Sequence, residues 1–451
     1  MITELHTATA RTPTGVLIFR LSLALFLAIA VARMHDFIAV LQYFRPGKLL
    51  VLPLLLTLVV AVPRWQLFAA MRTTTAKCVA VVVALAVLSI PLSLWPANSA
   101  QSFAQALTPS LVLFAMIGIG FADRRTAGFC ILAFVIAVGI DALYLLAGPA
   151  PTKAGRPFIG PALDPNDSAA LFVTTLPWAM LLVSDRGVKR VLGLVVAVLA
   201  AAGVVATGSR GGVVGLVVVG ALLVVRAEHK RRWIYVLVVA VCAAAFALTA
   251  DDARRERFAT IFAPRKDYNV TEREGRIQVW QRGLRYMATH PVLGVGLDNF
   301  MIAEGVLGRD ENQRSGIRYT AAHNAFIQVG AELGVIGLAA FLFGLWSAGR
   351  DCRRIQRLAA LDRQTHPRIA DVEERFAGTA FCALCGLFTT MCFLSLAYHP
   401  ISLFALGVCV GVRAGSPYAA HDSPWVRHTV RASSPVPSHG ATAHAALDAA
   451  G

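Results

Sequence analysis

Long apolar runs alternate with short polar segments along most of the chain. Twelve such runs cover residues 16–32, 47–62, 77–95, 103–121, 127–147, 167–184, 190–206, 212–225, 233–249, 323–347, 376–397 and 400–412. A helix of about 20 apolar residues is long enough to cross a bilayer. Backbone groups in lipid must be satisfied within the segment, and these runs are too uniformly apolar for barrel strands. The pattern therefore predicts an all-α polytopic membrane protein with about 12 transmembrane helices.

Two longer polar segments complete the predicted organisation. Residues 250–322 are too long for a passive connector, so we expect a functional loop that contains short helices. Residues 414–451 are rich in Pro, Ser, His and Ala, a composition typical of a disordered tail. We accordingly expect helices 1–9 in residues 1–249, the large loop in 250–322, helices 10–12 in 323–413, and the tail in 414–451.

Composition supports this class of protein. Hydrophobic residues make up 57% of the chain, charged residues only 15%, and the mean hydropathy is +0.63. A soluble domain carries about 25% charged residues. These values exclude a soluble enzyme, a disordered chain and a disulfide-stapled secreted domain. The Cys-x-x-Cys of Cys382 and Cys385 lies in an apolar run, so we interpret these cysteines as packing residues rather than a redox or metal site. The first run has no convincing cleavage site after it and is expected to be a retained span.

The formal net charge of +16 is explained by basic loops on one side of the membrane. With a cytoplasmic N-terminus, the cytoplasmic loops carry Arg64, Arg72, Arg124, Arg125, Arg186, Lys189, Arg190, Arg226, Lys230, Arg231, Arg232 and the basic run 350–375. The short external loops carry fewer basic residues. This asymmetry places residues 250–322 outside and both termini in the cytoplasm, and it makes nucleic acid unnecessary as a partner.

One predicted helix stands out within the large loop. The segment TEREGRIQVWQRGLRYMATHP starts with a capping box of Thr271 and Glu274 and is stopped by Pro291. Its apolar stripe is Ile277, Trp280, Leu284 and Met287, which we expect on the membrane side or packed against the ends of the membrane helices. The flanking arginines are Arg273, Arg276, Arg282 and Arg285. Together they fit a solvated face, although Arg276 has a stronger case as a functional residue.

Two further features on the predicted external side could carry chemistry. Arg210 lies in TGSRGG, a tight turn whose small residues allow the guanidinium to grip a phosphate with two N–H groups. An interfacial anchor is the alternative. His323 begins the tenth run and is followed by Asn324. A helix N-terminus and nearby arginines favour a neutral, proton-accepting imidazole. This suits a general base, and an ordinary interfacial histidine is the alternative.

Other polar residues near or within the runs are lesser candidates. Glu332, Asp141 and Arg20 fall inside predicted spans, where a functional role and a packing pair are both consistent with the sequence. Asp164 is expected to cap the helix that starts the sixth run, and His399 lies in the turn before the twelfth. The chain has no HExxH, no GxSxG and no Cys/His cluster, so neither a metal nor another cofactor is expected.

These motifs together resemble the O-antigen ligase and polymerase superfamily of bacterial envelope glycan enzymes. The resembling segments are SIPLSLWPANS (residues 89–99), DPNDSAALF (164–172), TGSRGG (207–212), GRIQVWQRG (275–283), HPVLGVGLDNF (290–300) and HNAFIQVGAELGVIG (323–337). The order of these motifs, with one large external loop before the tenth span, is similar to that superfamily. The resemblance covers residues 75–345 well and both ends weakly.

The resemblance implies a metal-independent glycosyltransferase in the bacterial inner membrane. It would act on the periplasmic side, on a lipid-linked donor and a lipid-linked acceptor. The donor would be a glycan on undecaprenyl diphosphate, and the acceptor would be the lipid A-core of lipopolysaccharide. Arg210 and Arg276 would hold the diphosphate, His323 would act as the base or position the acceptor, and Asn324 and Trp280 would contact the diphosphate or glycan. Attack in line with the leaving group would invert the anomeric centre.

Several relatives share this chemistry and differ in the acceptor. We favour a ligase over a polymerase that extends a lipid-linked O-antigen or exopolysaccharide, and over a protein O-oligosaccharyltransferase. The length of the chain and its short tail fit a ligase better than the protein-transferring relatives, which are usually longer. A transporter or lipid flippase is the alternative from another class. It is disfavoured because no internal repeat is evident and because a transporter has no need of an arginine-rich external loop. The sugar, the linkage and the oligomeric state are not determined by these patterns.

Overall fold

The computed structural model describes residues 13–33, 46–148, 152–153, 155–160, 163–226, 232–233, 240, 255, 275–307 and 319–419. Some predictions therefore lie outside the described residues. These are most of the ninth run at 233–249, the capping box of Thr271 and Glu274, Arg273, and the tail beyond Ala419.

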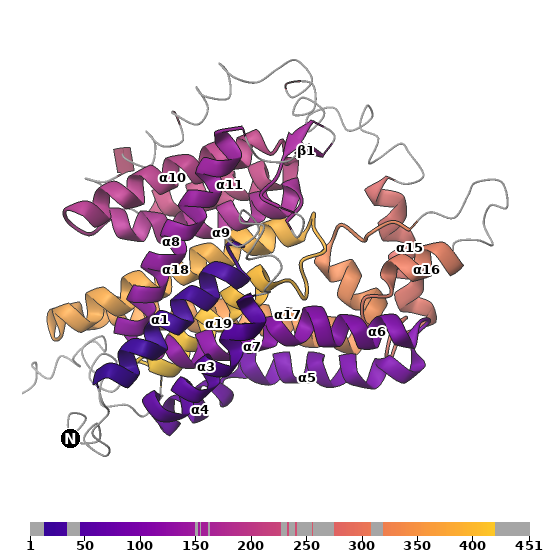
Figure 1. The fold of residues 1–451 in the computed structure, drawn as a ribbon, viewed down its shortest axis with the longest axis horizontal. Helices are drawn as coiled ribbons and strands as arrows, with labels where there is room; N and C mark the ends of the chain where they lie inside the picture. Colours follow the sequence, from indigo (N-terminus) through magenta and orange to yellow (C-terminus); the bar gives the residue numbers. More distant parts are fainter. Residues whose placement is uncertain are drawn as a thin grey trace, which may run out of the picture.

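The described chain is helical almost throughout (Figure 1). The bundle helices are α1 (Pro13–Ala30), α3 (Pro46–Ala61), α4 (Arg64–Met71), α5 (Thr74–Ser89), α6 (Pro96–Ser102), α7 (Thr108–Gly120), α8 (Arg124–Leu146), α9 (Pro165–Val183), α10 (Val188–Ala206), α11 (Arg210–Arg226), α17 (Ala325–Leu361), α18 (Pro367–Met391) and α19 (Pro400–Gly415). The large loop contributes α15 (Arg276–Thr289) and α16 (Phe300–Val306), and a two-stranded hairpin pairs β1 (Thr152–Lys153) with β2 (Arg156–Pro157).

The predicted fold class is confirmed as an all-α membrane protein. Every predicted run outside 233–249 overlaps a helix. In the part of the chain that the structure describes, six helices are long and apolar enough to cross a membrane, or seven if the bent pair α3–α4 is one span. The helices of that pair meet at 110°. The count of twelve spans and the sides of the membrane stay predictions.

Some helix boundaries differ from the predicted ones. The connection between the predicted runs 77–95 and 103–121 contains α6, because Pro96 starts a helix that continues through a π-helical turn at Phe103–Leu107 into α7. The predicted run 323–347 continues as α17 to Leu361. Ordered structure also extends past the predicted tail boundary at 413, since Tyr418 is fully buried and donates a hydrogen bond to Asp362 at 2.7 Å.

Close helix packing in the bundle relies on small residues. A Cβ on Gly193 of α10 would lie 2.5 Å from the carbonyl oxygen of Ala179 in α9, and one on Gly407 of α19 would lie 2.8 Å from that of Phe114 in α7. Small residues at such contacts let the backbones approach, and dispersion then replaces the hydrophobic effect that lipid does not supply. α9 and α19 are consequently buried along nearly their whole length.

A single arginine ties three helices together at the end of the bundle that is predicted to be cytoplasmic. Arg124, at the start of α8, donates from Nε and Nη2 to the two carboxylate oxygens of Glu373 in α18, at 2.7 and 2.9 Å. It also donates to the carbonyls of Phe121, Gly411 and Val412. This bidentate geometry satisfies a cluster of buried polar groups where α8, α18 and α19 meet. A second arginine, Arg20 of α1, is half-buried and pairs with Asp123 at 3.0 Å, as expected for a packing pair inside the bundle.

The large loop has a small core of its own at one end of the bundle, where Figure 1 shows α15 and α16 lying beyond the bundle helices. Its buried residues come from α15, α16, α17 and the segments that join them, and are Val279, Tyr286, Val295, Phe300, Ala303, Ala322 and Ala331. The predicted start at Thr271 was therefore wrong, whereas the membrane side expected for the apolar stripe stays a prediction. The helix begins at Arg276 because the backbone of Gly275 is extended, and its buried face runs through Gly283, while Ile277 and Leu284 are exposed.

α17 is broken at Gly334, where the backbone takes φ 71° and ψ −173°. The break leaves backbone groups without helical partners, and the loop 291–296 satisfies them. Val295 and Gly296 donate to the carbonyls of Ala331 and Glu332 at 2.8 and 3.0 Å, and Val335 donates to Pro291 at 2.8 Å. The first segment of α17 is thereby attached to the large loop rather than only to the bundle.

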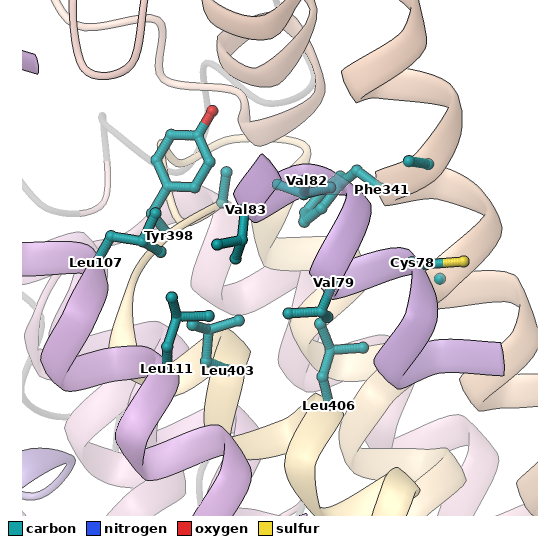
Figure 2. Close-up of a pocket in the computed structure, with 13 residues that line it drawn as sticks. Cys78, Val79, Val82, Val83, Leu107, Leu111, Phe341, Tyr398, Leu403 and Leu406 are labelled. Atoms are coloured by element: carbon teal, nitrogen blue, oxygen red, sulfur yellow. The ribbon is translucent and has the colours of Figure 1, made fainter. Parts of the chain in front are cut away.

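An apolar cavity of about 20 Å³ lies between α5, α7, α17 and α19 (Figure 2). Its walls include Val79, Leu107, Phe341 and Leu406, and Tyr398 lies at one end. The cavity is apolar and scarcely larger than a water molecule, so it does not serve as a glycan site.

Candidate functional site

The start of α17 is held at the turn between α18 and α19. The backbone N–H of His323 donates to Ser395 Oγ at 2.9 Å, and Nδ2 of Asn324 donates to the carbonyl of Cys392 at 3.0 Å. Both partners belong to the segment that follows α18, which ends at Met391. The predicted eleventh run extended to 397, so sequence reasoning placed this turn inside a span and missed its role.

Asn324 is the N-cap of α17. Its Oδ1 accepts hydrogen bonds from the backbone N–H groups of Phe326 and Ile327 at 2.9 and 3.0 Å. These are donors that a helix start otherwise leaves unsatisfied. The Oδ1 of Asn324 thus fixes the start of α17, and its Nδ2 fixes the turn after α18. Its predicted contact with substrate stays a prediction.

His323 precedes this cap in an uncommon backbone conformation. Its φ is 47°, in the left-handed region that few residues other than glycine adopt. Its side chain is half-buried. Because the residues on either side are each hydrogen bonded to another element, the surrounding structure holds the backbone that carries the imidazole.

α15 is attached beside His323 through Trp280. The indole Nε1–H donates to the carbonyl of Ala322, the residue before His323, at 3.0 Å. Arg276 lies four residues before Trp280, one turn nearer the helix start on the same face. Arg276 therefore lies on the face of α15 that is directed toward the 322–323 segment. The indole N–H is used in this attachment, so a role for Trp280 in contacting glycan stays a prediction.

Arg210 is the first residue of α11, directly after a tight turn. Thr207 and Ser209 are buried, Gly208 takes φ 61°, and Ser209 Oγ accepts a hydrogen bond from the N–H of Gly212 at 3.2 Å. A Cβ on Gly211 would lie 2.8 Å from Cβ of Phe393. The start of α11 thus packs on the same turn that holds His323 and Asn324.

Four helix N-termini gather around this turn. Those of α11 and α17 contact it directly, and α19 starts from it at His399. α9 is joined to the group because a Cβ on Gly212 would lie 2.6 Å from that of Ala169. Its predicted cap is confirmed, since Asp164 accepts from the N–H groups of Asn166 and Asp167 at 2.7 and 2.9 Å. Aligned N-termini carry partial positive charge and favour an anion.

His399 is engaged as a helix cap. Its Nδ1 accepts the N–H of Ile401 at 3.3 Å, so the proton of the neutral ring lies on Nε2 and neither nitrogen is left to accept another. Burial, together with the positive charge of Arg33, lowers the pKa of His399 to about 4. Its lone-pair nitrogen is occupied, which makes His323 the better candidate for a base.

Glu332 and Arg282 are both engaged in contacts with residues of the large loop. Glu332 is buried beside the break in α17, where Oε1 accepts the N–H of Phe300 at 3.3 Å. Arg282 does not lie on a solvated face as predicted. It donates from Nη2 to Glu304 at 2.6 Å, and Tyr286 donates to the same carboxylate at 2.7 Å. Burial and this hydrogen bond raise the pKa of Tyr286. The small loop core therefore includes a buried ionic network.

Asp141 is fully buried in α8, away from any predicted helix end.

Among the described residues, no group of three or more His, Cys, Asp or Glu side chains is arranged to hold a metal ion. Arginine side chains and helix N-termini are the positive groups that the described site offers to an anionic substrate. The predicted absence of a cofactor remains a prediction.

The chain was compared with known protein families. Residues 195–342 match the model of a family described as O-antigen ligase. The match runs from the middle of α10 through α11, the large loop and the first part of α17, and it contains Arg210, Arg276, Trp280, His323 and Asn324. The resemblance to the O-antigen ligase superfamily is thereby confirmed. No curated protein matches the chain.

Proposed function

Because residues 195–342 carry a domain of the O-antigen ligase family, we propose that this membrane protein transfers a glycan from undecaprenyl diphosphate to the lipid A-core of lipopolysaccharide. The reaction takes place at the periplasmic face of the bacterial inner membrane. The observation that carries the proposal is the convergence of three separate elements on one turn. The segments bearing Arg210, His323 and Arg276 are joined there through Phe393, Ser395 and the Trp280–Ala322 hydrogen bond.

The donor presents a diphosphate to this site. Arg210 and Arg276 bind its oxygens, each with two parallel N–H groups, and the N-termini of α11 and α17 add partial positive charge. As the bond between the anomeric carbon and the diphosphate oxygen breaks, negative charge grows on the leaving group. Fixed donors aimed at that charge stabilise the transition state more than the ground state.

The acceptor hydroxyl supplies the nucleophile. His323 accepts its proton, the hydroxyl oxygen bonds to the anomeric carbon from the face opposite the diphosphate, and the configuration inverts. Polyprenyl diphosphate leaves with the electron pair of the broken bond. A neutral imidazole at the N-terminus of α17 suits the base, because the positive helix end disfavours the imidazolium ion.

The lipopolysaccharide of a deletion strain tests this function and its nearest alternative. A bare lipid A-core together with free lipid-linked polymer is expected for a ligase, and the wild-type gene should restore the capped form. A core that carries one repeat unit would instead identify a polymerase. Unchanged lipopolysaccharide would contradict both.

A further inference from the structure

Arg156 of the β1–β2 hairpin connects two of the helix starts at the site. Its Nε donates to the carbonyl of Thr207 at 2.7 Å, and its Nη2 donates to Oδ1 of Asn166 at 2.8 Å. The guanidinium is half-buried. The hairpin therefore reaches the turn before α11 and the first turn of α9 with a single side chain.

Thr207 occupies the joint between α10 and α11. It is the C-cap of α10, and it stands three residues before Arg210. The last carbonyls of a helix have no helical partner and carry partial negative charge. A guanidinium N–H satisfies one of them, so Arg156 holds the position at which the chain reverses between the two helices.

Asn166 fixes the other end of this connection. It belongs to the first turn of α9, whose cap is Asp164. α9 and α11 pack closely just below, since a Cβ on Gly212 would meet that of Ala169 at 2.6 Å. The small residues set the distance between α9 and α11. Arg156 links the first turn of α9 to the turn before α11.

We propose that Arg156 is a positioning residue for Arg210. It fixes the Thr207 turn against α9 and so sets the direction in which the first side chain of α11 leaves the helix. The inference rests on the proposed function for its consequence in transfer. The positioning itself is a property of the fold. A displacement of about 1 Å at a reacting group can reduce a rate by about 100-fold, so a residue that touches no substrate can still control turnover.

The experiment compares Arg156→Lys with Arg190→Lys in purified full-length protein. Arg190 is a matched control because it also donates from Nε to a backbone carbonyl, that of Val183 at 3.2 Å, at the opposite end of α9 and α10. Two readouts are taken. Amide hydrogen exchange of the peptide covering residues 207–213 reports the turn, and kcat with lipid-linked donor reports transfer. Asn166→Ala, which removes one of the two acceptors, keeps the test available if Arg156→Lys does not fold.

Arg156→Lys should increase exchange in residues 207–213 and lower kcat about 10- to 100-fold. In an Arg210→Lys background the same change should lower kcat by less than about twofold, because a residue that acts through Arg210 has little left to affect. Asn166→Ala should change both readouts in the same direction by less. Arg190→Lys should change neither.

Unchanged exchange in both Arg156→Lys and Asn166→Ala would overturn the inference whatever the activity. The inference would also be overturned if the double variant lost kcat by the product of the two single losses. Arg156 and Arg210 would then act independently. If the wild-type protein transfers no glycan, the proposed function fails, and the exchange measurement still decides whether Arg156 fixes the turn.

Discussion

The indole N–H of Trp280 donates a 3.0 Å hydrogen bond to the carbonyl of Ala322, next to His323. This contact crosses from the helix that carries Arg276 to the segment that enters α17. A loop helix without such an attachment could take many orientations relative to the membrane helices. The contact therefore makes the loop part of the site instead of a separate appendage.

The first prediction concerns the sides of the membrane. A Gln281→Cys variant places a thiol on the exposed face of α15, which should react with a membrane-impermeant maleimide in intact spheroplasts. Lys189→Cys, exposed in the first turn of α10 on the side predicted to be cytoplasmic, should react only after lysis. The parent chain measures labelling of its eight native cysteines. The reverse pattern would contradict the orientation and with it a periplasmic site.

The second prediction concerns the two arginines. Arg210→Lys and Arg276→Lys should each raise the transition-state barrier by about 1.5–3 kcal/mol, although the charge is kept, because an ammonium cannot reproduce the planar two-point contact with a diphosphate. Arg285→Lys is the control on the exposed side of α15. The measurement is kcat/KM with lipid-linked donor. Wild-type transfer by both lysine variants would make these arginines membrane anchors.

The third prediction concerns the base. His323→Ala should lower kcat by about 10²- to 10⁴-fold while binding of the donor survives, because the arginines rather than the imidazole hold the diphosphate. Turnover and donor affinity are measured separately in purified protein. A variant that keeps turnover and weakens only acceptor binding would make His323 an acceptor-positioning residue.

The fourth prediction concerns pH and His399. Its pKa is lowered from the usual 6.5 to about 4 in the folded protein, so between these values the unfolded chain binds a proton that the folded chain does not. The part of the free energy of unfolding that depends on His399 is therefore largest above pH 6.5, and it falls as the pH drops toward 4. His399→Asn keeps a residue that can cap α19 and removes the titration. Its melting temperature should change less than that of wild type between pH 7 and pH 5. An equal change in both proteins would assign the pH dependence to other groups.

The fifth prediction concerns the break in α17. Gly334→Ala puts a Cβ against the carbonyl oxygen of Pro291 at a φ of 71°, so it should destabilise the protein by at least about 1–3 kcal/mol. It should also reduce transfer, because His323 directly precedes the segment of α17 that the 291–296 loop holds. Gly128→Ala in α8 is the matched control, because its Cβ would meet nothing within 4 Å and a helical alanine is favoured by about 0.5–1 kcal/mol. Equal melting temperatures for the two variants would contradict the tight docking of the 291–296 loop.

The class of the protein and most of its helices follow from the amino-acid pattern alone. Apolar runs of near-spanning length have only one way to satisfy their backbone in lipid, so local pattern and element coincide. Short polar motifs were equally informative where one residue sets a helix end, as at Asp164. Residue type and motif also single out Arg210, Arg276 and His323 as candidates, and their roles stay predictions.

How these residues are held depends on contacts between helices that are distant along the chain. The hydrogen bonds that His323 donates to Ser395 and that Arg156 donates to Thr207 join positions 72 and 51 residues apart. The buried pair of Arg282 and Glu304 likewise turns an apparent solvated face into part of a core. Such contacts leave no periodic signal along the chain, because their partners come from different elements and depend on how those elements pack. The hydrophobic periodicity of the sequence indicates which face of one helix is buried. The candidate site depends instead on which helix ends lie close together.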